Sequence, residues 1–264
     1  MKLKKTLLAS LIAGVVVSGA HAQAPAPAEV KIGVVTFLSG PVAAPFGVPA
    51  RNAAEVLIEQ FNAGTAPAPY NKKGFGGAPV KMVLIDEAGS PTSVVTEYRN
   101  LVQREKVDMV VGYVSSGNCL AVAPVAEELK AVTMFFDCGT PRIFEEAPKN
   151  YVFRAVNHAT ADSVGAALYL KATKPGIKTY AGINQNYAWG QDSWNDFDAT
   201  MKLFYPNATV TTSQMPKLFA GQYSSEISAL MSNKAEVIHT SFYGGDLEAF
   251  ILQSLSLIHI SEPT

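Results

Sequence analysis

Apolar runs alternate with helical patterns along this sequence, and this alternation limits the folds that the chain can adopt. The first apolar run, Val30 to Leu38, is followed by residues 48–64, where apolar side chains recur at helical spacing. Residues 80–86 form the next apolar run, and Ser90 and Pro91 after it are typical of a helix N-cap and first helical position. Strands that alternate with helices form right-handed βαβ units. The sequence therefore predicts an α/β fold with parallel sheets flanked by helices on both faces.

The same rhythm continues to the end of the chain and divides it into two parts. We expect a boundary near residues 151–155, where the first series of four strands ends, with a first α/β lobe at 30–152 and a second at 153–254. The remaining predicted strands are residues 107–114, 131–137, 178–185, 208–216 and 235–243, and the remaining predicted helices are 121–130, 162–173, 190–205, 223–233 and 246–254.

The N-terminus has the features of an export signal. Three lysines in the first five residues precede an uncharged, mostly apolar run at 6–18, which is too short to span a bilayer comfortably. The small residues Ala20 and Ala22 then form a cleavage site, so we interpret residues 1–22 as a secretory signal peptide. The residue after the site is Gln23 and not cysteine, which gives no signal for lipid attachment. We expect a periplasmic protein in which the Pro- and Ala-rich residues 23–29 form a short linker.

The last ten residues do not match the pattern that precedes them. The segment LSLIHISEPT, residues 255–264, follows a helix pattern without any capping or loop signal. One of its back-translations resembles the adaptor DNA of sequencing libraries, so we interpret 255–264 as a non-native tail that leaves the second lobe incomplete. A buried strand is the alternative, because LSLIHI alternates in polarity.

Charge and cysteine content narrow the classes of function. The 21 Lys and Arg residues nearly balance the 22 Asp and Glu residues, and no basic stripe occurs, which argues against a nucleic-acid partner. The two cysteines, Cys119 and Cys138, follow consecutive strands that should be neighbours in the sheet. In an oxidising compartment this placement predicts a disulfide, with two separate small apolar side chains as the alternative.

Small polar residues gather where the predicted strands end. Ligands of open α/β sheets bind outside the carboxyl ends of the strands, and each of the first four strands is followed there by Gly together with Ser or Thr. Glycine lets a ligand approach the backbone, and a helix N-terminus offers free N–H groups to a carboxylate. Hydroxyl groups both donate and accept hydrogen bonds. In a single loop, helix capping explains these residues equally well, but several loops on one edge indicate a binding site.

Four motifs in order give the chain a family resemblance: KIGVVTFLSGPVAAPFGVPARNAAEVLIEQFNAG, VVGYVSSGNC, CGTP and NQNYAWGQD. With these motifs, residues 30–254 resemble the periplasmic solute-binding proteins of the branched-chain amino acid (Leu/Ile/Val-binding) type, which are receptors of ABC importers. The resemblance implies the two-lobed type I periplasmic binding protein fold, with a ligand trapped between the lobes by hinge closure. It also implies the permease subunits of an importer as partners, and no cofactor.

The resemblance assigns roles to individual positions. Ser116 is similar to the residue whose backbone and hydroxyl hold the ligand's carboxylate, with Ser115 and Val114 in the same turn. Thr140, with the backbone of Cys138 and Gly139, is similar to the family's second small-residue loop. In the family, that loop binds the ligand's carboxylate and ammonium groups. Aromatic walls are implied at Phe46 in the first lobe, at Trp189 or Tyr187, and at Tyr243 or Phe242 in the second lobe. The family's acidic residue for the ammonium group would lie beyond Ser254.

The sequence also departs from the family pattern. It has CGT where the family often has a run similar to Ala-Ala-Thr, and the segment NYAWGQDSW is rich in aromatic residues. Arg142 is either an extra partner for a carboxylate or, as a helix residue, exposed to solvent. These departures leave amino acids, aromatic acids, other carboxylates and short amides open as ligands. The sequence thus predicts a receptor for a small carboxylate-bearing solute.

Two other functions compete with that of a transport receptor. A periplasmic sensor on the same fold would pass its bound state to a signalling partner, since fold does not fix function. A hydrolase is the weaker alternative, because the chain has no G-x-S-x-G turn. His158 and His239 have no Cys, Asp or Glu neighbours at ligand spacing, so no metal site is expected. For the adjacent acids Asp86 and Glu87 we predict loop capping and not acid–base catalysis.

Overall fold

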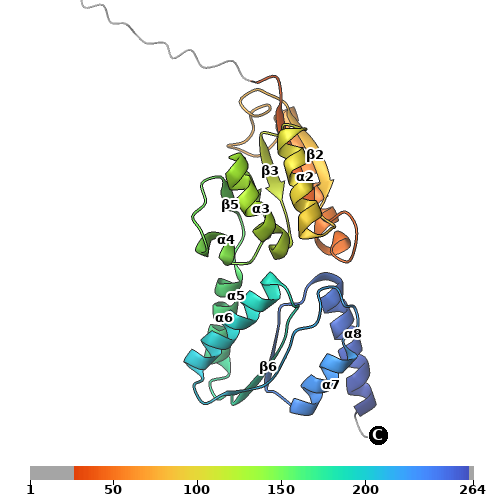
Figure 1. Cartoon of the computed structure of the whole chain (residues 1–264), viewed down its shortest axis with the longest axis vertical. Helices are drawn as coiled ribbons and strands as arrows, with labels where there is room; N and C mark the ends of the chain where they lie inside the picture. The colour runs from red at the N-terminus through yellow and green to blue at the C-terminus, as the bar shows by residue number, and fades with distance from the viewer. Residues whose placement is uncertain (1–26, 262–264) are drawn as a thin grey trace, which may run out of the picture.

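Two α/β lobes follow one another along the chain in the computed structural model, which describes residues 27–261 (Figure 1). The predicted signal peptide at 1–22, residues 23–26 of the linker and residues 262–264 of the tail lie outside the described residues. Within 27–261, no helix combines the length and the apolar character needed to cross a bilayer.

The first lobe contains a five-stranded parallel sheet with the strand order β2-β1-β3-β4-β5. Val30 lies opposite Val80, and Ile32 lies opposite Met109. The strands are β1 (Val30–Thr36), β2 (Val80–Asp86), β3 (Met109–Gly112), β4 (Thr133–Phe135) and β5 (Val152–Arg154). The helices are η1 (Ala43–Gly47, a π-helical turn), α1 (Val48–Ala63), α2 (Pro91–Gln103), α3 (Ser116–Leu129) and α4 (Arg142–Glu145).

The second lobe contains a three-stranded parallel sheet with the strand order β7-β6-β8. Its strands are β6 (Thr179–Ile183), β7 (Thr209–Gln214) and β8 (Val237–Thr240). Its helices are α5 (Ala159–Thr173), α6 (Ala188–Phe204), α7 (Ser224–Asn233) and α8 (Gly244–Ser261). The parallel α/β fold predicted from the alternation of patterns is therefore confirmed.

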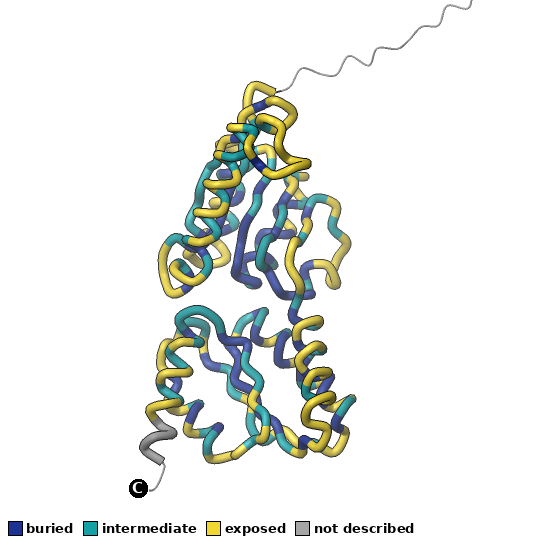
Figure 2. Tube along the Cα trace, turned by 180° about the vertical axis from the view of Figure 1, so that it is seen from behind, coloured by how far each residue is buried: buried dark blue, intermediate teal, exposed yellow. Residues whose placement is uncertain are grey.

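Each lobe has its own hydrophobic core around its sheet, and the buried backbone in Figure 2 follows the strands. In the first lobe, Tyr98, Leu101 and Phe135 pack from helix α2 and strand β4. In the second lobe, α5 and α6 cover one face of the sheet with a cluster that includes Phe197. Helices α7 and α8 cover the other face, where Ile227 is buried. Burial from both faces explains why the strands read as nearly continuous apolar runs.

Several elements differ from the sequence prediction, and three of these differences affect the ends of the lobes or the site. Helix α3 begins at Ser116, five residues before its predicted start at 121, because Ser115 caps it. Strand β5 was not predicted, and the expected lobe boundary at 152/153 falls inside it, so we propose that the crossing begins after Arg154. Residues 255–261 continue helix α8 and do not form the alternative strand, while their non-native origin stays a prediction.

Candidate functional site

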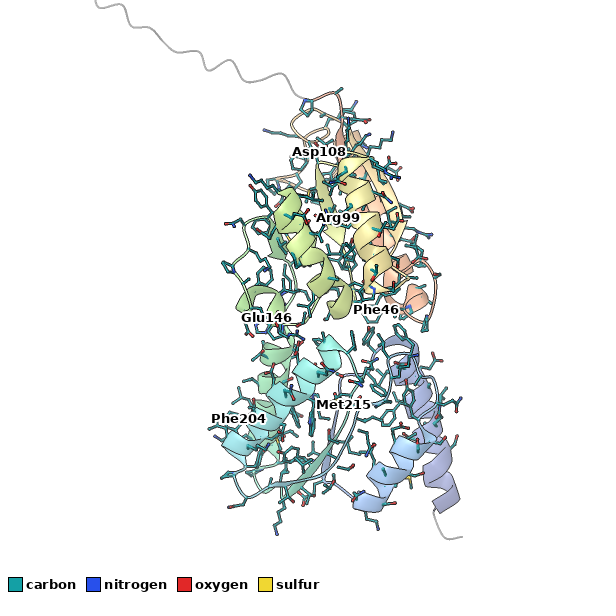
Figure 3. The ribbon with its side chains drawn as sticks, in the orientation of Figure 1. Phe46, Arg99, Asp108, Glu146, Phe204 and Met215 are labelled. Carbon is teal, nitrogen blue, oxygen red and sulfur yellow. A yellow bond between two sulfur atoms is a disulfide. The ribbon has the colours of Figure 1, made fainter. Side chains whose placement is uncertain are left out.

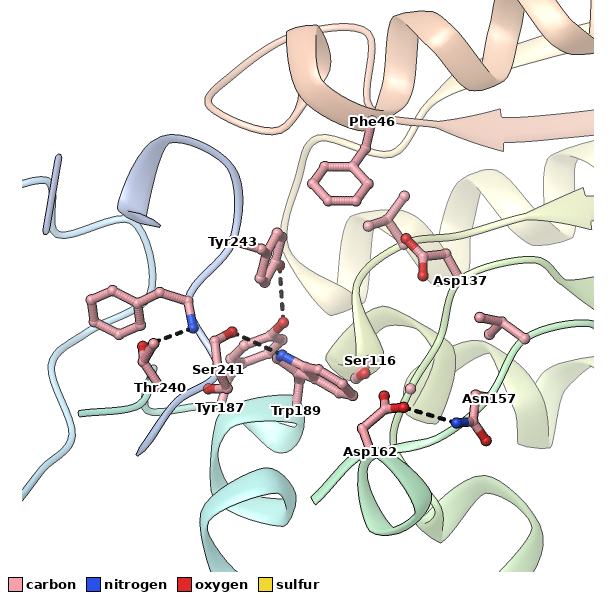
Figure 4. A pocket seen from close by; sticks show the side chains of 14 residues that line it. Phe46, Ser116, Asp137, Asn157, Asp162, Tyr187, Trp189, Thr240, Ser241 and Tyr243 are labelled. Carbon is pink, nitrogen blue, oxygen red and sulfur yellow. Dashed lines mark hydrogen bonds between the residues drawn. The ribbon is translucent and has the colours of Figure 1, made fainter. Parts of the chain in front are cut away.

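A cavity of about 260 Å³ lies between the two lobes, at segments that follow the carboxyl ends of their strands (Figure 4). Both lobes supply its walls. The lining residues are Phe46, Val114, Ser116, Asp137, Gly139, Val156, Asn157, Asp162, Tyr187, Trp189, Thr240, Ser241, Phe242 and Tyr243.

The turn after β3 is held in place by a buried carboxylate from the turn after β2. Glu87 accepts hydrogen bonds from the backbone N–H groups of Val114 (2.7 Å) and Ser115 (2.8 Å), and from the Asn118 side chain (3.2 Å). Asp86 likewise accepts bonds from the amides of Leu38 and Ala88, so the predicted loop-capping role of this acidic pair is confirmed. The hydrogen bonds to Glu87 hold this turn in place and so fix the position of Ser116 at the cavity.

Ser116 combines a hydroxyl with the start of a helix. Its Oγ accepts a hydrogen bond from the N–H of Thr140 at 3.2 Å, which leaves its own O–H proton able to donate into the cavity. Because α3 begins at Ser116, the first amides of that helix have no intrahelical partner. Ser115 does not line the cavity, since its hydroxyl accepts a bond from the N–H of Asn118 and caps the helix.

The loop at 138–140 is anchored by an arginine side chain and by a disulfide. Arg154 Nη1 donates to the carbonyls of Cys138 (3.1 Å) and Thr140 (2.7 Å). Cys138 is bonded to Cys119 in a disulfide, with Cα atoms 6.3 Å apart. The loop therefore presents Gly139 to the cavity while Cys138 and Thr140 are fully buried behind it.

Aromatic side chains form the second-lobe wall. Tyr187 donates from its hydroxyl to the hydroxyl of Tyr243 at 2.9 Å, so the proton of Tyr243 remains able to donate to a ligand. Trp189 donates its indole N–H to the carbonyl of Ser241 at 3.0 Å. Phe46, from η1 of the first lobe, meets Tyr243 edge to face with ring centroids 5.7 Å apart. These rings enclose the cavity from both lobes.

Two carboxyl groups near the cavity have raised pKa values. Burial raises the pKa of Asp137 to about 6. Burial also raises the pKa of Glu87 to about 7, against the opposing effect of the amides of Val114 and Ser115 and the Asn118 side chain. Burial raises the pKa values of Tyr187 and Tyr243 further above their ordinary value, so both phenols are neutral.

The structure brings most of the predicted site residues together. Phe46, Ser116, Gly139, Tyr187, Trp189 and Tyr243 all line the cavity, as do Val114 and Phe242. Ser115, Cys138 and Thr140 do not, and the Thr140 hydroxyl is bonded to Asp192 of α6. Arg142 does not line it either, because its guanidinium pairs with Glu146 at 2.7 Å.

Sequence reasoning missed several lining residues, among them the acids Asp137 and Asp162. Asp137 is the second residue after β4, so its place near a strand end was a signal, but the rule used for the sequence covered only hydroxyl groups and glycines. Asn157 and Asp162 follow β5, which was not predicted. Asn157 donates from its side-chain amide to Asp162 at 2.8 Å. In the part of the chain that the structure describes, no group of three or more His, Cys, Asp or Glu side chains is placed to hold a metal ion.

A family model described as "Periplasmic binding protein" matches residues 29–255 of this chain. The chain belongs to that family. Among curated relatives, the Leu/Ile/Val-binding protein BraC3 of Rhizobium johnstonii is 28% identical over 243 residues, which cover 91% of this chain and 60% of the relative. A Leu/Ile/Val-binding protein homolog of Brucella melitensis is 28% identical over 221 residues, 83% of this chain and 55% of the relative. This chain thus spans less than two thirds of these relatives' length.

Solved structures show the same fold. A periplasmic binding protein of Burkholderia mallei superposes with a TM-score of 0.76 at 22% identity, over 89% of this chain and 58% of that one. An ABC transporter solute-binding protein of R. palustris in complex with 4-hydroxybenzoate has a TM-score of 0.71 at 23% identity, over 87% and 60%. A leucine-binding protein of Thermotoga maritima has a TM-score of 0.70 at 21% identity, over 86% and 60%. The type I periplasmic binding protein fold implied by the motifs is confirmed.

Proposed function

We propose that this protein is the periplasmic receptor of an ABC importer, which binds a small carboxylate-bearing solute and delivers it to the importer's permease. The observation that carries this proposal is the cavity itself, whose walls come from both lobes. A solute in that position would be enclosed when the lobes close and released when they open.

The carboxylate is expected at Ser116. The free proton of its hydroxyl and the first-turn amides of α3 that Ser115 does not cap are donors suited to a carboxylate, and the helix dipole favours negative charge there. The hydroxyl of Tyr243 is a further donor from the second lobe. Leucine and 4-hydroxybenzoate, named for solved relatives, share a carboxylate, which supports this part of the proposal.

A ligand screen followed by one variant tests the binding. Thermal-shift measurements with amino acids, aromatic acids and short amides should identify a solute, and calorimetry should show it bound at least about tenfold more weakly by Ser116→Ala, the effect of one lost hydrogen bond to a charged group. Ser90→Ala is the matched control, because Ser90 caps α2 outside the cavity. It should lower stability and leave affinity unchanged. Absence of any ligand, or equal affinities for Ser116→Ala and the wild type, would contradict the proposal.

Delivery to a permease needs a separate experiment. Deletion of the gene in its host should reduce uptake of the radiolabelled solute, and the reintroduced gene should restore it. Unchanged uptake together with an altered cellular response to the solute would indicate the sensor instead.

A further inference from the structure

The cavity has an unusual charge balance for a site expected to hold a carboxylate. Its lining includes two carboxylates, Asp137 and Asp162, and no lysine or arginine from the part of the chain that the structure describes. The two arginines of the neighbouring segments are engaged elsewhere, Arg142 with Glu146 and Arg154 with backbone carbonyls. A solute whose only charge is a carboxylate would add a further negative charge to this space.

Asp137 is the carboxylate without a partner. Among residues 27–256, no side chain or amide donates a hydrogen bond to it and no cation pairs with it, whereas Asp162 accepts a bond from Asn157 at 2.8 Å. In Figure 4, Asp137 points into the space between Phe46, Tyr243 and Ser116. A partly buried carboxylate that lacks a counter-charge is costly when ionised, and a cation placed beside it removes that cost.

Aromatic rings surround the same space. Phe46, Tyr187, Trp189, Phe242 and Tyr243 all line the cavity. The faces of such rings attract ammonium groups, and an aromatic enclosure with one carboxylate is a recurrent arrangement for binding organic cations. The rings and the acid come from different elements and both favour positive charge.

We infer that the solute carries an ammonium or quaternary ammonium group, held by Asp137 within the aromatic enclosure, while its carboxylate lies at Ser116. The inference rests on the proposed receptor function and narrows it. Zwitterions such as amino acids and betaines supply an ammonium group for Asp137 and a carboxylate for Ser116. Aromatic acids such as benzoate supply only the carboxylate. Asp137 is therefore the residue that we expect to favour binding of zwitterions over binding of aromatic acids.

Matched probes test the inference without knowledge of the natural solute. Leucine, 4-methylpentanoate and 3-methylbutylamine share a hydrocarbon chain, and so do phenylalanine, 3-phenylpropanoate and 2-phenylethylamine. Glycine betaine and benzoate complete the set. In each of the two series, two probes carry an ammonium group and the third carries only a carboxylate. By calorimetry at pH 7.5, each ammonium-bearing probe should bind at least tenfold more tightly than the carboxylate-only probe of its series.

The variant Asp137→Asn removes the charge and keeps the shape. It should weaken the ammonium-bearing probe at least tenfold and leave the carboxylate-only probe unchanged or more tightly bound. Asp108→Asn makes the same change of charge at the far end of the first lobe, where Asp108 accepts a bond from the N–H of Lys31 (Figure 3), and should alter neither affinity.

The pH dependence of the unaltered protein gives a second measurement that does not depend on a variant. Since burial raises the pKa of Asp137 to about 6, an ammonium probe should bind more tightly as pH rises from 5.5 to 7.5, and a carboxylate-only probe more weakly. The other titratable groups that interact with Asp137 are Glu87, Tyr187 and Tyr243, and Glu87 acts in the same direction.

The outcomes separate this inference from the proposed function. Binding of the carboxylate-only probes as tightly as, or more tightly than, their ammonium-bearing counterparts would overturn the inference and leave the receptor function standing. Weakening by Asp162→Asn and not by Asp137→Asn would overturn the assignment to Asp137. Absence of binding by every probe would overturn both proposals.

Discussion

The hydroxyl of Thr140, in the first lobe, donates a hydrogen bond to the carboxylate of Asp192, in helix α6 of the second lobe. Because the two residues belong to different lobes, this bond can form only when the lobes are together. Burial raises the pKa of Asp192, while the bond from Thr140 opposes that rise. Under the proposed function, we expect the pair to act as a latch when the lobes close on a solute.

Loss of this latch should weaken solute binding without unfolding either lobe. A hydrogen bond to a charged group contributes about 1.5–3 kcal/mol, and Asp192 is partly exposed, so we expect Thr140→Val and Asp192→Asn each to lower affinity about tenfold. Calorimetry measures the affinity, and small-angle scattering should show a more open average shape with solute present.

Thr160→Val is the matched control for the latch. Thr160 donates to Asp196 at 2.7 Å, which is the same chemistry within the second lobe. Its loss should reduce stability and leave affinity unchanged. If Thr140→Val weakens binding and Asp192→Asn does not, Thr140 contacts the solute directly, as the sequence predicts, and the latch is wrong.

We expect closure of the lobes to depend also on the absence of a side chain at Gly139. A Cβ atom added there would overlap the ring of Trp189 from the second lobe, at its Cζ3 and Cε3 atoms. We expect Gly139→Ala to hold the lobes apart and to reduce solute affinity at least about tenfold, the scale of one overpacked contact.

A double-mutant cycle distinguishes this collision from local damage. With Trp189→Ala in place, the added methyl group meets no ring, so Gly139→Ala should then cost much less affinity. Gly165→Ala in α5 is the control, since a Cβ there has open space around it and alanine favours helix. Additive effects of Gly139→Ala and Trp189→Ala would refute the collision.

The buried carboxyl of Glu87 should make the folded state less stable as pH rises. Burial raises its pKa from 4.5 to about 7, so the folded protein holds a proton that the unfolded chain releases between these values. The stability present below pH 4.5 is therefore lost as pH rises to about 7, by roughly 3 kcal/mol. Asp137, Tyr113, Tyr187 and Tyr243 interact electrostatically with Glu87, and the raised pKa of Asp137 gives a slope of the same sign.

Urea unfolding between pH 5 and 8 measures this slope. Glu87→Gln should flatten most of it. Glu127→Gln should not change it, because burial of Glu127 is outweighed by bonds from the backbone amides of Tyr151 and Asn150, so that its pKa is lowered and its protonation occurs below this range. A slope that is equal in the wild type and in Glu87→Gln would show that Glu87 does not titrate there.

The sequence predicted the sheets well because their strands are buried on both faces. A strand that is buried on both faces consists mostly of apolar residues, as residues 80–86 do, so it can be recognised from the sequence. Strand β5 has only three residues and no run of its own, so its pairing of Val152 with Thr133 is decided by the fold and not by local pattern. The early start of α3 was missed because Gly117 is a poor helix former, and the cap at Ser115 outweighs it.

The walls of the site were more predictable than its polar contacts. Ser116 and Gly139 lie after strands, where parallel sheets place ligands, and a rule of topology was enough to find them. The bond between Thr140 and Asp192 joins residues 52 positions apart in different lobes. It depends on how the lobes meet, and nothing in the local sequence around either residue indicates it.

The disulfide between Cys119 and Cys138 offers a final prediction. It joins the first turns of α3 to the loop that carries Gly139, and it closes a chain segment of 19 residues. Loop-closure entropy predicts that such a bridge stabilises the fold by about 3 kcal/mol, through its effect on the unfolded state. Thiol titration of the unfolded, unreduced protein should find no free thiol, and Cys119→Ala with Cys138→Ala should lower the free energy of unfolding by about that amount. The reduced wild type is the control for packing, because it loses the bond and keeps both sulfur atoms. Two free thiols in the unreduced protein would refute the bridge, whereas a loss of stability in the double variant but not in the reduced protein would show that the two side chains contribute through packing alone.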